Sequence, residues 1–135
     1  KDATGDPNRI DETLKKLGPD FIQLTGEDGF ALEFNKRGGV GIISVTANIA
    51  PKLCSDFQNY SKSETDNEIK EAERIDQILQ PIHKSLFIES NPAPVKYAAK
   101  LLGLCGDEIR LPLVKIKKET EDHVKKALLA ANLLN

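Results

Sequence analysis

The sequence predicts an α/β fold over residues 1–50, followed by an all-helical region over residues 51–135. Two observations support this division. In the first part, short apolar runs of β type at residues 21–25 and 40–45 alternate with helical segments at a period near twenty residues, as in the βα units of a parallel sheet. After Pro51 the β-type runs end, and the pattern becomes helical. We therefore expect a structural boundary near residue 50.

The first helix is predicted over residues 7–17. Asp6 is a suitable N-cap, and Pro7 suits the first turn because a proline there gives up no hydrogen bond. Gly18 and Pro19 then stop the helix. Its apolar residues recur at helical spacing: Ile10, Leu14 and Leu17.

A strand, a helix and a second strand follow. Gly26 closes the run at residues 21–25, and Asp28 is placed to cap a helix that carries Ala31, Leu32 and Phe34. Gly38 and Gly39 end this helix. The run at residues 40–45 is continuously apolar, which is typical of a strand buried on both faces of a parallel sheet.

Four helices are predicted in the second region, over residues 51–60, 66–88 with a kink at Pro81, 92–102 and 117–133. Between the last two, residues 109–116 form an apolar connector around Pro112 that we expect to be extended.

Composition restricts the function. The 135 residues carry a formal net charge of −2, which gives no field to attract nucleic acid or an anionic membrane. No apolar run reaches the roughly 18 residues of a membrane span, and no signal-peptide pattern opens the chain, so we expect a cytoplasmic protein. Cys54 and Cys105 lie far apart without a nearby histidine pair. We expect both to be reduced core thiols, and we expect no metal site.

The strand count predicts an incomplete sheet. Two strands, with a third that ends at Lys1, cannot close a (β/α)₈ barrel, which needs eight strands and about 250 residues. Because the chain opens on Lys1 and not on Met, we expect a fragment, a processed chain or a trimmed one. Its open sheet edge predicts self-association.

Five motifs occur in order along the chain: residues 1–6 (Lys-Asp-Ala-Thr-Gly-Asp), 24–28, 38–48, 89–96 and 109–113. Over essentially the whole chain, these motifs resemble the dihydrodipicolinate synthase family, also called 4-hydroxy-tetrahydrodipicolinate synthases. The last three favour this family over the related N-acetylneuraminate lyases. The resemblance implies the C-terminal part of a (β/α)₈ TIM barrel, from the end of strand six to strand eight, followed by a helical C-terminal domain.

The family's activity follows from the same resemblance. It implies a lyase of the diaminopimelate pathway that condenses pyruvate with aspartate semialdehyde through a lysine Schiff base, without metal or organic cofactor. By motif, Lys1 is the Schiff-base lysine. The backbone carbonyl of Ile43 lines the pyruvate pocket, and Thr25 and Gly26 end strand seven at the same mouth.

Other family site groups, namely a tyrosine cluster, a threonine pair and an arginine, match nothing in this chain. We therefore expect the isolated chain to be inactive. Two alternatives stay open: another Schiff-base pyruvate aldolase of the N-acetylneuraminate lyase superfamily, or a catalytically inactive truncated assembly module. Because the family is commonly tetrameric, the resemblance also implies a homo-oligomer.

Overall fold

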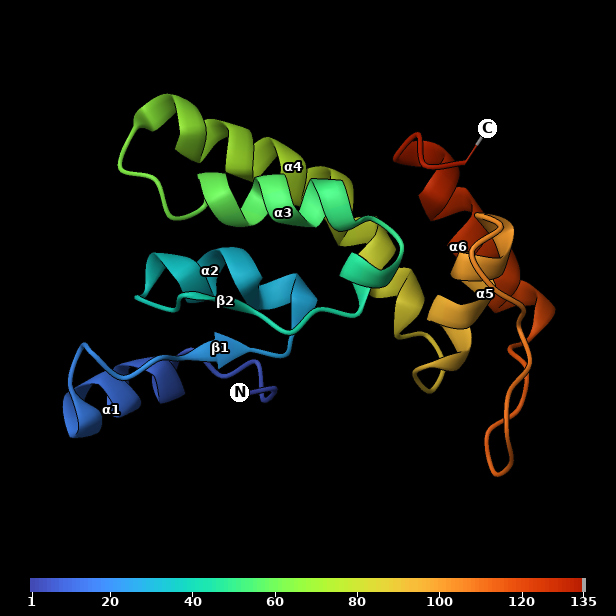
Figure 1. Cartoon of the computed structure of the whole chain (residues 1–135), viewed down its shortest axis with the longest axis horizontal. Coiled ribbons are helices and arrows are strands. Elements are labelled where there is room, and N and C mark those ends of the chain that lie inside the picture. The colour runs from blue at the N-terminus through green and yellow to red at the C-terminus, as the bar shows by residue number, and fades with distance from the viewer. Residues whose placement is uncertain (135) are drawn as a thin grey trace. The chain divides into compact units, whose positions relative to one another are not determined.

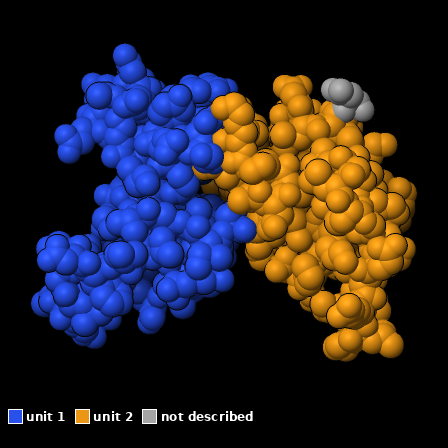
Figure 2. Space-filling model, in the orientation of Figure 1, with its two compact units in different colours: residues 1–44, 55–76 blue, residues 45–54, 77–135 orange. Residues whose placement is uncertain are grey.

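The computed structural model describes residues 1–134 and divides into two compact units (Figures 1 and 2). Unit 1 consists of residues 1–44 and 55–76, and unit 2 consists of residues 45–54 and 77–135. Helices α3 (Pro51–Tyr60) and α4 (Asp66–Leu86) contribute residues to both units. The boundary expected near residue 50 for a barrel and a helical domain stays a prediction.

Unit 1 contains a small parallel sheet with helices before and after each strand (Figure 1). Strands β1 (Leu24–Thr25) and β2 (Gly41–Ile42) pair in parallel, with Leu24 opposite Gly41 and Thr25 opposite Ile42. Asp2 forms a parallel bridge with Thr25 on the other side of β1. Three parallel segments therefore lie in the order Asp2, β1, β2, which confirms the predicted βα arrangement.

Helix α1 (Asn8–Leu17) agrees with the predicted limits to one residue. Asp6 accepts a hydrogen bond through Oδ1 from the backbone amide of Asn8 at 2.9 Å. The N-cap residue is Pro7, without a side-chain cap hydrogen bond, so the prediction of Asp6 as the N-cap is wrong by one residue. At the other end, Gly18 has a φ of 84° and donates its amide to the carbonyl of Leu14 at 2.9 Å. A positive φ of this kind is far more accessible to glycine than to other residues, which explains why the helix stops there.

The second helical segment of unit 1 comprises a 3₁₀ turn, η1 (Asp28–Phe30), and α2 (Ala31–Lys36). Gly39, just beyond it, packs tightly against Phe34. A Cβ added at Gly39 would lie 2.0 Å from Phe34 Cδ1 and 2.8 Å from the Phe34 carbonyl oxygen. No side chain fits there, so Gly39 lets the chain turn closely around the end of α2.

The strands are shorter and more exposed than predicted. Only Leu24–Thr25 and Gly41–Ile42 are strand, against predicted runs of five and six residues. The expectation that residues 40–45 are buried on both faces is wrong, because Val40 is 46% exposed and Ile43 is 51% exposed. The reason is pairing: among residues 1–134, β2 pairs with β1 alone. Parallel strands are fully buried only where neighbouring strands and helices cover both faces.

Unit 2 is helical. Its elements are η2 (Thr46–Asn48), the start of α3, the end of α4, α5 (Ala93–Leu101) and α6 (Lys118–Ala130). Helix α5 packs against α6 and contacts η2. All four predicted helices are present, and α6 ends three residues before its predicted limit at residue 133. Helix α4 continues through Pro81. The fully buried side chains of this unit include Leu79, Ile82, Leu86, Val124 and Leu128.

The connector between α5 and α6 has neither helix nor strand over residues 109–116, but it is not extended throughout. The chain turns at residues 111–112, where the Leu113 amide donates to the Arg110 carbonyl at 3.1 Å, so the expected extended conformation is present only in part. Asp107 forms ion pairs with Lys100 at 2.8 Å and with Lys115 at 3.0 Å. The two ammonium groups lower the pKa of Asp107 to about 2. Cys105 lies exposed in this connector, so the expectation of a core thiol holds for the buried Cys54 and is wrong for Cys105.

The start of α6 is held by an acidic side chain from outside the helix. Glu89 accepts a hydrogen bond through Oε1 from the Lys117 amide at 2.8 Å. The side chain of Thr120 also bonds to it and, with this amide, lowers the pKa of Glu89. A carboxylate at a helix N-terminus is stabilising because unpaired amides point towards it. Among the helices of residues 1–134, none is long and apolar enough to cross a membrane.

Candidate active site

The candidate site lies at the carboxyl ends of the three parallel segments in unit 1. The Asp2 amide donates to the Leu24 carbonyl at 2.8 Å, and the Gly26 amide donates to the Asp2 carbonyl at 2.6 Å. The Ile43 amide donates to the Thr25 carbonyl at 2.9 Å. This ladder brings the first residues of the chain, Gly26 and Ile43 to the same edge. Loops and strand ends at this edge carry catalytic residues in α/β barrels.

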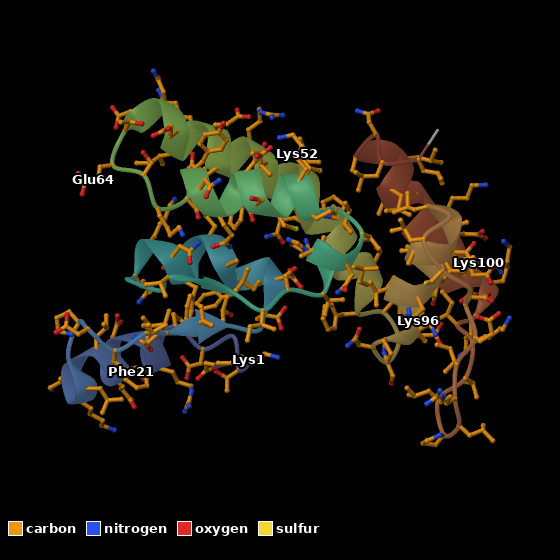
Figure 3. The ribbon with its side chains drawn as sticks, viewed as in Figure 1. Lys1, Phe21, Lys52, Glu64, Lys96 and Lys100 are labelled. Atoms are coloured by element: carbon orange, nitrogen blue, oxygen red, sulfur yellow. The ribbon has the colours of Figure 1, made fainter. Side chains whose placement is uncertain are left out.

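The pairing register decides which side chains share a face. Side chains alternate along a strand, and paired residues of parallel strands point the same way. Lys1, Gly26 and Ile43 therefore lie on one face of the sheet, and Figure 3 shows Lys1 next to β1. The structure brings these three predicted site residues together.

Gly26 makes room for the Lys1 side chain. A Cβ added at Gly26 would lie 2.2 Å from Lys1 Cε and 3.2 Å from Lys1 Nζ. Any larger residue would push the lysine away. Glycine allows this close approach because it has no Cβ. The neighbour of Gly26 in the structure is the exposed Lys1.

Thr25 is placed differently from the other predicted residues. The register puts it on the opposite face, with Asp2 and Ile42, and only 1% of it is exposed. Its hydroxyl oxygen accepts a hydrogen bond from the Glu27 amide at 3.0 Å. The Thr25 side chain thus stabilises the turn that carries Gly26.

Asp2 anchors the segment that follows Lys1. Its Oδ1 accepts hydrogen bonds from the Thr4 amide at 2.8 Å and the Thr4 hydroxyl at 2.6 Å, and its Oδ2 accepts one from Arg9 Nε on α1. The Thr4 hydroxyl and then Arg9 lower the pKa of Asp2 to about 2. Sequence reasoning missed this trio. The Asp-x-Thr spacing, which favours a local side-chain to backbone turn, was the available signal.

A second hydrogen bond joins the loops after the two strands. The hydroxyl of Ser44, just beyond β2, donates to Oδ1 of Asp28, which is 3% exposed. Asp28 was expected to cap a helix, but the structure shows no side-chain cap on η1 or α2. Instead, this buried carboxylate links the carboxyl ends of β1 and β2.

The chemistry available at this site is that of a primary amine. Lys1 supplies the amine at the open edge of the sheet, and the Asp2 and Asp28 hydrogen bonds hold the backbone around it. Over residues 1–134, no group of three or more His, Cys, Asp or Glu side chains is arranged to hold a metal ion. A primary amine is suited to covalent chemistry with a carbonyl compound.

Comparisons with known proteins agree with this geometry. The 4-hydroxy-tetrahydrodipicolinate synthase of Pelagibacter ubique is 69% identical over 134 residues, which are 99% of this chain and 46% of that protein. The dihydrodipicolinate synthase structure from Aquifex aeolicus has a TM-score of 0.90 and 35% identity, and covers 98% of this chain and 44% of that one. The Acinetobacter baumannii enzyme, solved with pyruvate, has a TM-score of 0.89 and 36% identity over 99% and 45% of the chains.

The chain therefore spans a little less than half the length of these relatives. The solved relatives are TIM barrels, and the fold of this chain corresponds to part of such a barrel. Residues 1–131 match the dihydrodipicolinate synthetase family along nearly the whole chain. From this match, and from the parallel strand ends that meet at Lys1, we conclude that the chain belongs to the dihydrodipicolinate synthetase family.

Proposed function

We propose that this chain supplies the Schiff-base part of the active site of a 4-hydroxy-tetrahydrodipicolinate synthase, a lyase of lysine biosynthesis. Its substrates are pyruvate and aspartate semialdehyde. The observation that carries the proposal is the passage of the Lys1 side chain across Gly26 at the carboxyl ends of parallel strands. The name of the Pelagibacter ubique relative and the pyruvate complex of the Acinetobacter baumannii relative support the choice of reaction and of first substrate.

In the proposed reaction, the uncharged Nζ of Lys1 attacks the ketone carbon of pyruvate. A carbon–nitrogen bond forms, the carbonyl oxygen takes one proton from the amine and one from a general acid and leaves as water, and a protonated imine remains. This imine accepts the electron pair released when the methyl group loses a proton, which gives an enamine. The enamine carbon then attacks the aldehyde carbon of aspartate semialdehyde, the aldehyde oxygen receives the π electron pair and a proton, and the imine forms again. Attack of water or of the substrate amine on the imine carbon then breaks the bond to Nζ and frees Lys1. These steps need no metal or organic cofactor.

The neighbouring residues position this amine in the proposal. Gly26 leaves the space in which the Lys1 side chain lies, and the backbone carbonyl of Ile43 lines the pyruvate pocket. Thr25 acts through the turn to Gly26, because its own side chain is on the far face. Asp2 fixes the backbone after Lys1 through Thr4 and Arg9. The residues that transfer protons and bind the substrate carboxylate belong to the part of the family's barrel that this chain does not match, so we expect the chain alone to be inactive.

The remaining parts of the proposal concern organisation. We propose that residues 51–135 form a helical C-terminal domain after the end of the barrel at residues 1–50, and that the protein is cytoplasmic. The exposed apolar residues beside β2, Val40 and Ile43, favour self-association through the open sheet edge.

A chimera tests the Schiff-base proposal. The N-terminal part of the Pelagibacter ubique relative, fused directly before Lys1, completes the barrel and removes the free terminal amine. Borohydride reduction with pyruvate should trap an adduct on the Lys1 side chain, found by peptide mass mapping. Lys1→Ala should abolish both adduct and condensation. Gly26→Ala, which displaces the Lys1 side chain, should lower the rate of adduct formation by about 100-fold, the typical cost of misplacing a reacting group by about 1 Å.

Three outcomes decide against the proposal. A folded chimera without an adduct at Lys1, or full condensation activity in the Lys1→Ala variant, would favour the inactive assembly module. Condensation that prefers another aldehyde over aspartate semialdehyde would favour the alternative Schiff-base aldolase.

A further inference from the structure

Unit 2 contains a groove between the end of α4 and the length of α6. Its volume is about 380 Å³, and its surface is nearly all apolar. The α4 side contributes Pro81 and Ile88, and the α6 side contributes Ala127 and Ala130. Because three of these four side chains are small, the two helices leave an open channel where larger residues would have filled the space.

The helical spacing explains why these residues face one another. On the α4 side, the lining residues are at positions 81, 84, 85 and 88, and on α6 they are at positions 123, 126, 127 and 130. Each set follows the i, i+3, i+4, i+7 pattern that places side chains on one face of a helix. Ile88, at one end, remains 49% exposed despite its size. An apolar face of this kind is normally covered.

The charges beside the groove are all of one sign. Among its described lining residues, the ionisable ones are Lys84, Lys126 and His123, and none is acidic. The two lysines are exposed and take no part in the ion pairs of residues 1–134. By contrast, Lys118 on the same helix pairs with Asp122 at 3.0 Å and with Glu121 at 3.3 Å. Two uncompensated ammonium groups thus border an apolar channel.

We propose that this groove binds a small amphiphilic carboxylate, whose hydrocarbon chain lies along Ala127 and Ala130 while its carboxylate lies between the ammonium groups of Lys84 and Lys126. The volume is at the lower end of the range for small-molecule sites, which favours a short acyl chain. A docked helix, about 10 Å across, needs a larger channel. The site uses no residue of the Lys1 site and does not depend on the proposed reaction.

Titration calorimetry with hexanoate, octanoate and decanoate tests the apolar part. Burying one methylene is worth about 0.8 kcal/mol, so each added methylene that enters the groove should tighten Kd by up to about fourfold. Ala130→Phe, a change at an exposed position, should fill the channel and abolish decanoate binding while circular dichroism stays unchanged. Decanoate binding that survives in this variant would overturn the proposal.

A matched pair of double variants tests the role of the two ammonium groups beside the groove. Lys84→Glu with Lys126→Glu should weaken decanoate binding by about tenfold, because the decanoate carboxylate would lose two exposed ion pairs with these ammonium groups. Lys70→Glu with Lys125→Glu makes the same change in net charge on the same two helices, outside the groove, and should leave Kd nearly unchanged. If both pairs of variants weakened decanoate binding equally, or if decylamine bound as tightly as decanoate, binding would not depend on a carboxylate between Lys84 and Lys126. Either result would overturn the proposal.

The chimera described above tests whether the groove stays open when the rest of the barrel is present. Decanoate should bind the chimera as tightly as it binds this chain. Loss of binding there would mean that the rest of the relative's sequence fills the groove, and the proposal would be wrong.

Discussion

Unit 1 and unit 2 differ in where their exposed apolar side chains lie. In unit 1, large apolar side chains remain exposed next to the strands, including Ile22 at 72% and Ile43 at 51%. In unit 2, the helices bury Leu86 and Leu128 completely, and the most exposed large apolar side chain, Leu111 at 86%, lies in the connector outside the helices.

The difference follows from how the two kinds of element satisfy their backbone. A helix forms its hydrogen bonds within itself and needs a neighbour along one apolar stripe only, so α5 and α6 can cover each other. A parallel strand needs a partner on each edge and a layer on each face. Helices α5 and α6 of unit 2 therefore cover part of each other's apolar surface, while the strands of unit 1 lack the partners that they require.

The largest expected effect is on the free energy of unfolding, when one apolar side chain is truncated in each unit and the two losses are compared. Leu128→Ala should lower the free energy of unfolding by about 2–5 kcal/mol, because it removes a fully buried side chain. Val40→Ala, at a half-exposed position, should change it by less than about 0.5 kcal/mol. Urea unfolding followed by circular dichroism measures both. If Val40→Ala costs as much as Leu128→Ala in this chain, the two units do not differ as described. In the chimera, Val40→Ala should become clearly destabilising.

Limited proteolysis with trypsin compares the same regions without substitutions. We expect residues 51–133 to survive longer than residues 1–50, because cleavage needs local opening, and opening is easiest where few apolar side chains are buried. Intact-mass measurement over time identifies the fragments. Persistence of the first 50 residues after loss of the helical part would contradict the predicted boundary. In the chimera, the first 50 residues should become as resistant as the rest.

The smallest expected effect concerns one carboxylate in each unit. Asp2 and Asp107 both have a pKa of about 2, below the ordinary value of about 3.9 for aspartate. Since the folded pKa is the lower one, each contributes stability that is present above about pH 4 and is lost as the pH falls towards 2. The main cause differs: the hydroxyl of Thr4 for Asp2, and the ammonium groups of Lys100 and Lys115 for Asp107.

Carbon-13 NMR of the carboxyl groups can separate these causes. Thr4→Val should raise the pKa of Asp2 alone, and Lys100→Met should raise that of Asp107 alone. About 1 M salt should raise the pKa of Asp107 more than that of Asp2, because salt screens exposed charges more than it weakens a hydroxyl hydrogen bond. Equal salt responses would show that charge dominates at both positions.

Much of the helical structure could be predicted from local signals. Pro7 and Gly18 mark the two ends of α1. Lys1, Gly26 and Ile43 could be chosen as site residues by resemblance, and the structure brings them to one face. The burial expected at residues 40–45 and at Cys105 was wrong, since burial depends on partners far away in the chain.

The sequence by itself thus determined the helices, the order of the βα units and the family, because caps, breakers, periodicity and motifs are local properties of the chain. Only the tertiary structure decided that Thr25 faces away from Lys1, that Gly26 accommodates the lysine, and that Asp2 is tied to Arg9. These facts depend on strand register, and one residue of slip reverses every face. Register is set by hydrogen bonds between segments that are distant in sequence, and no local pattern encodes them.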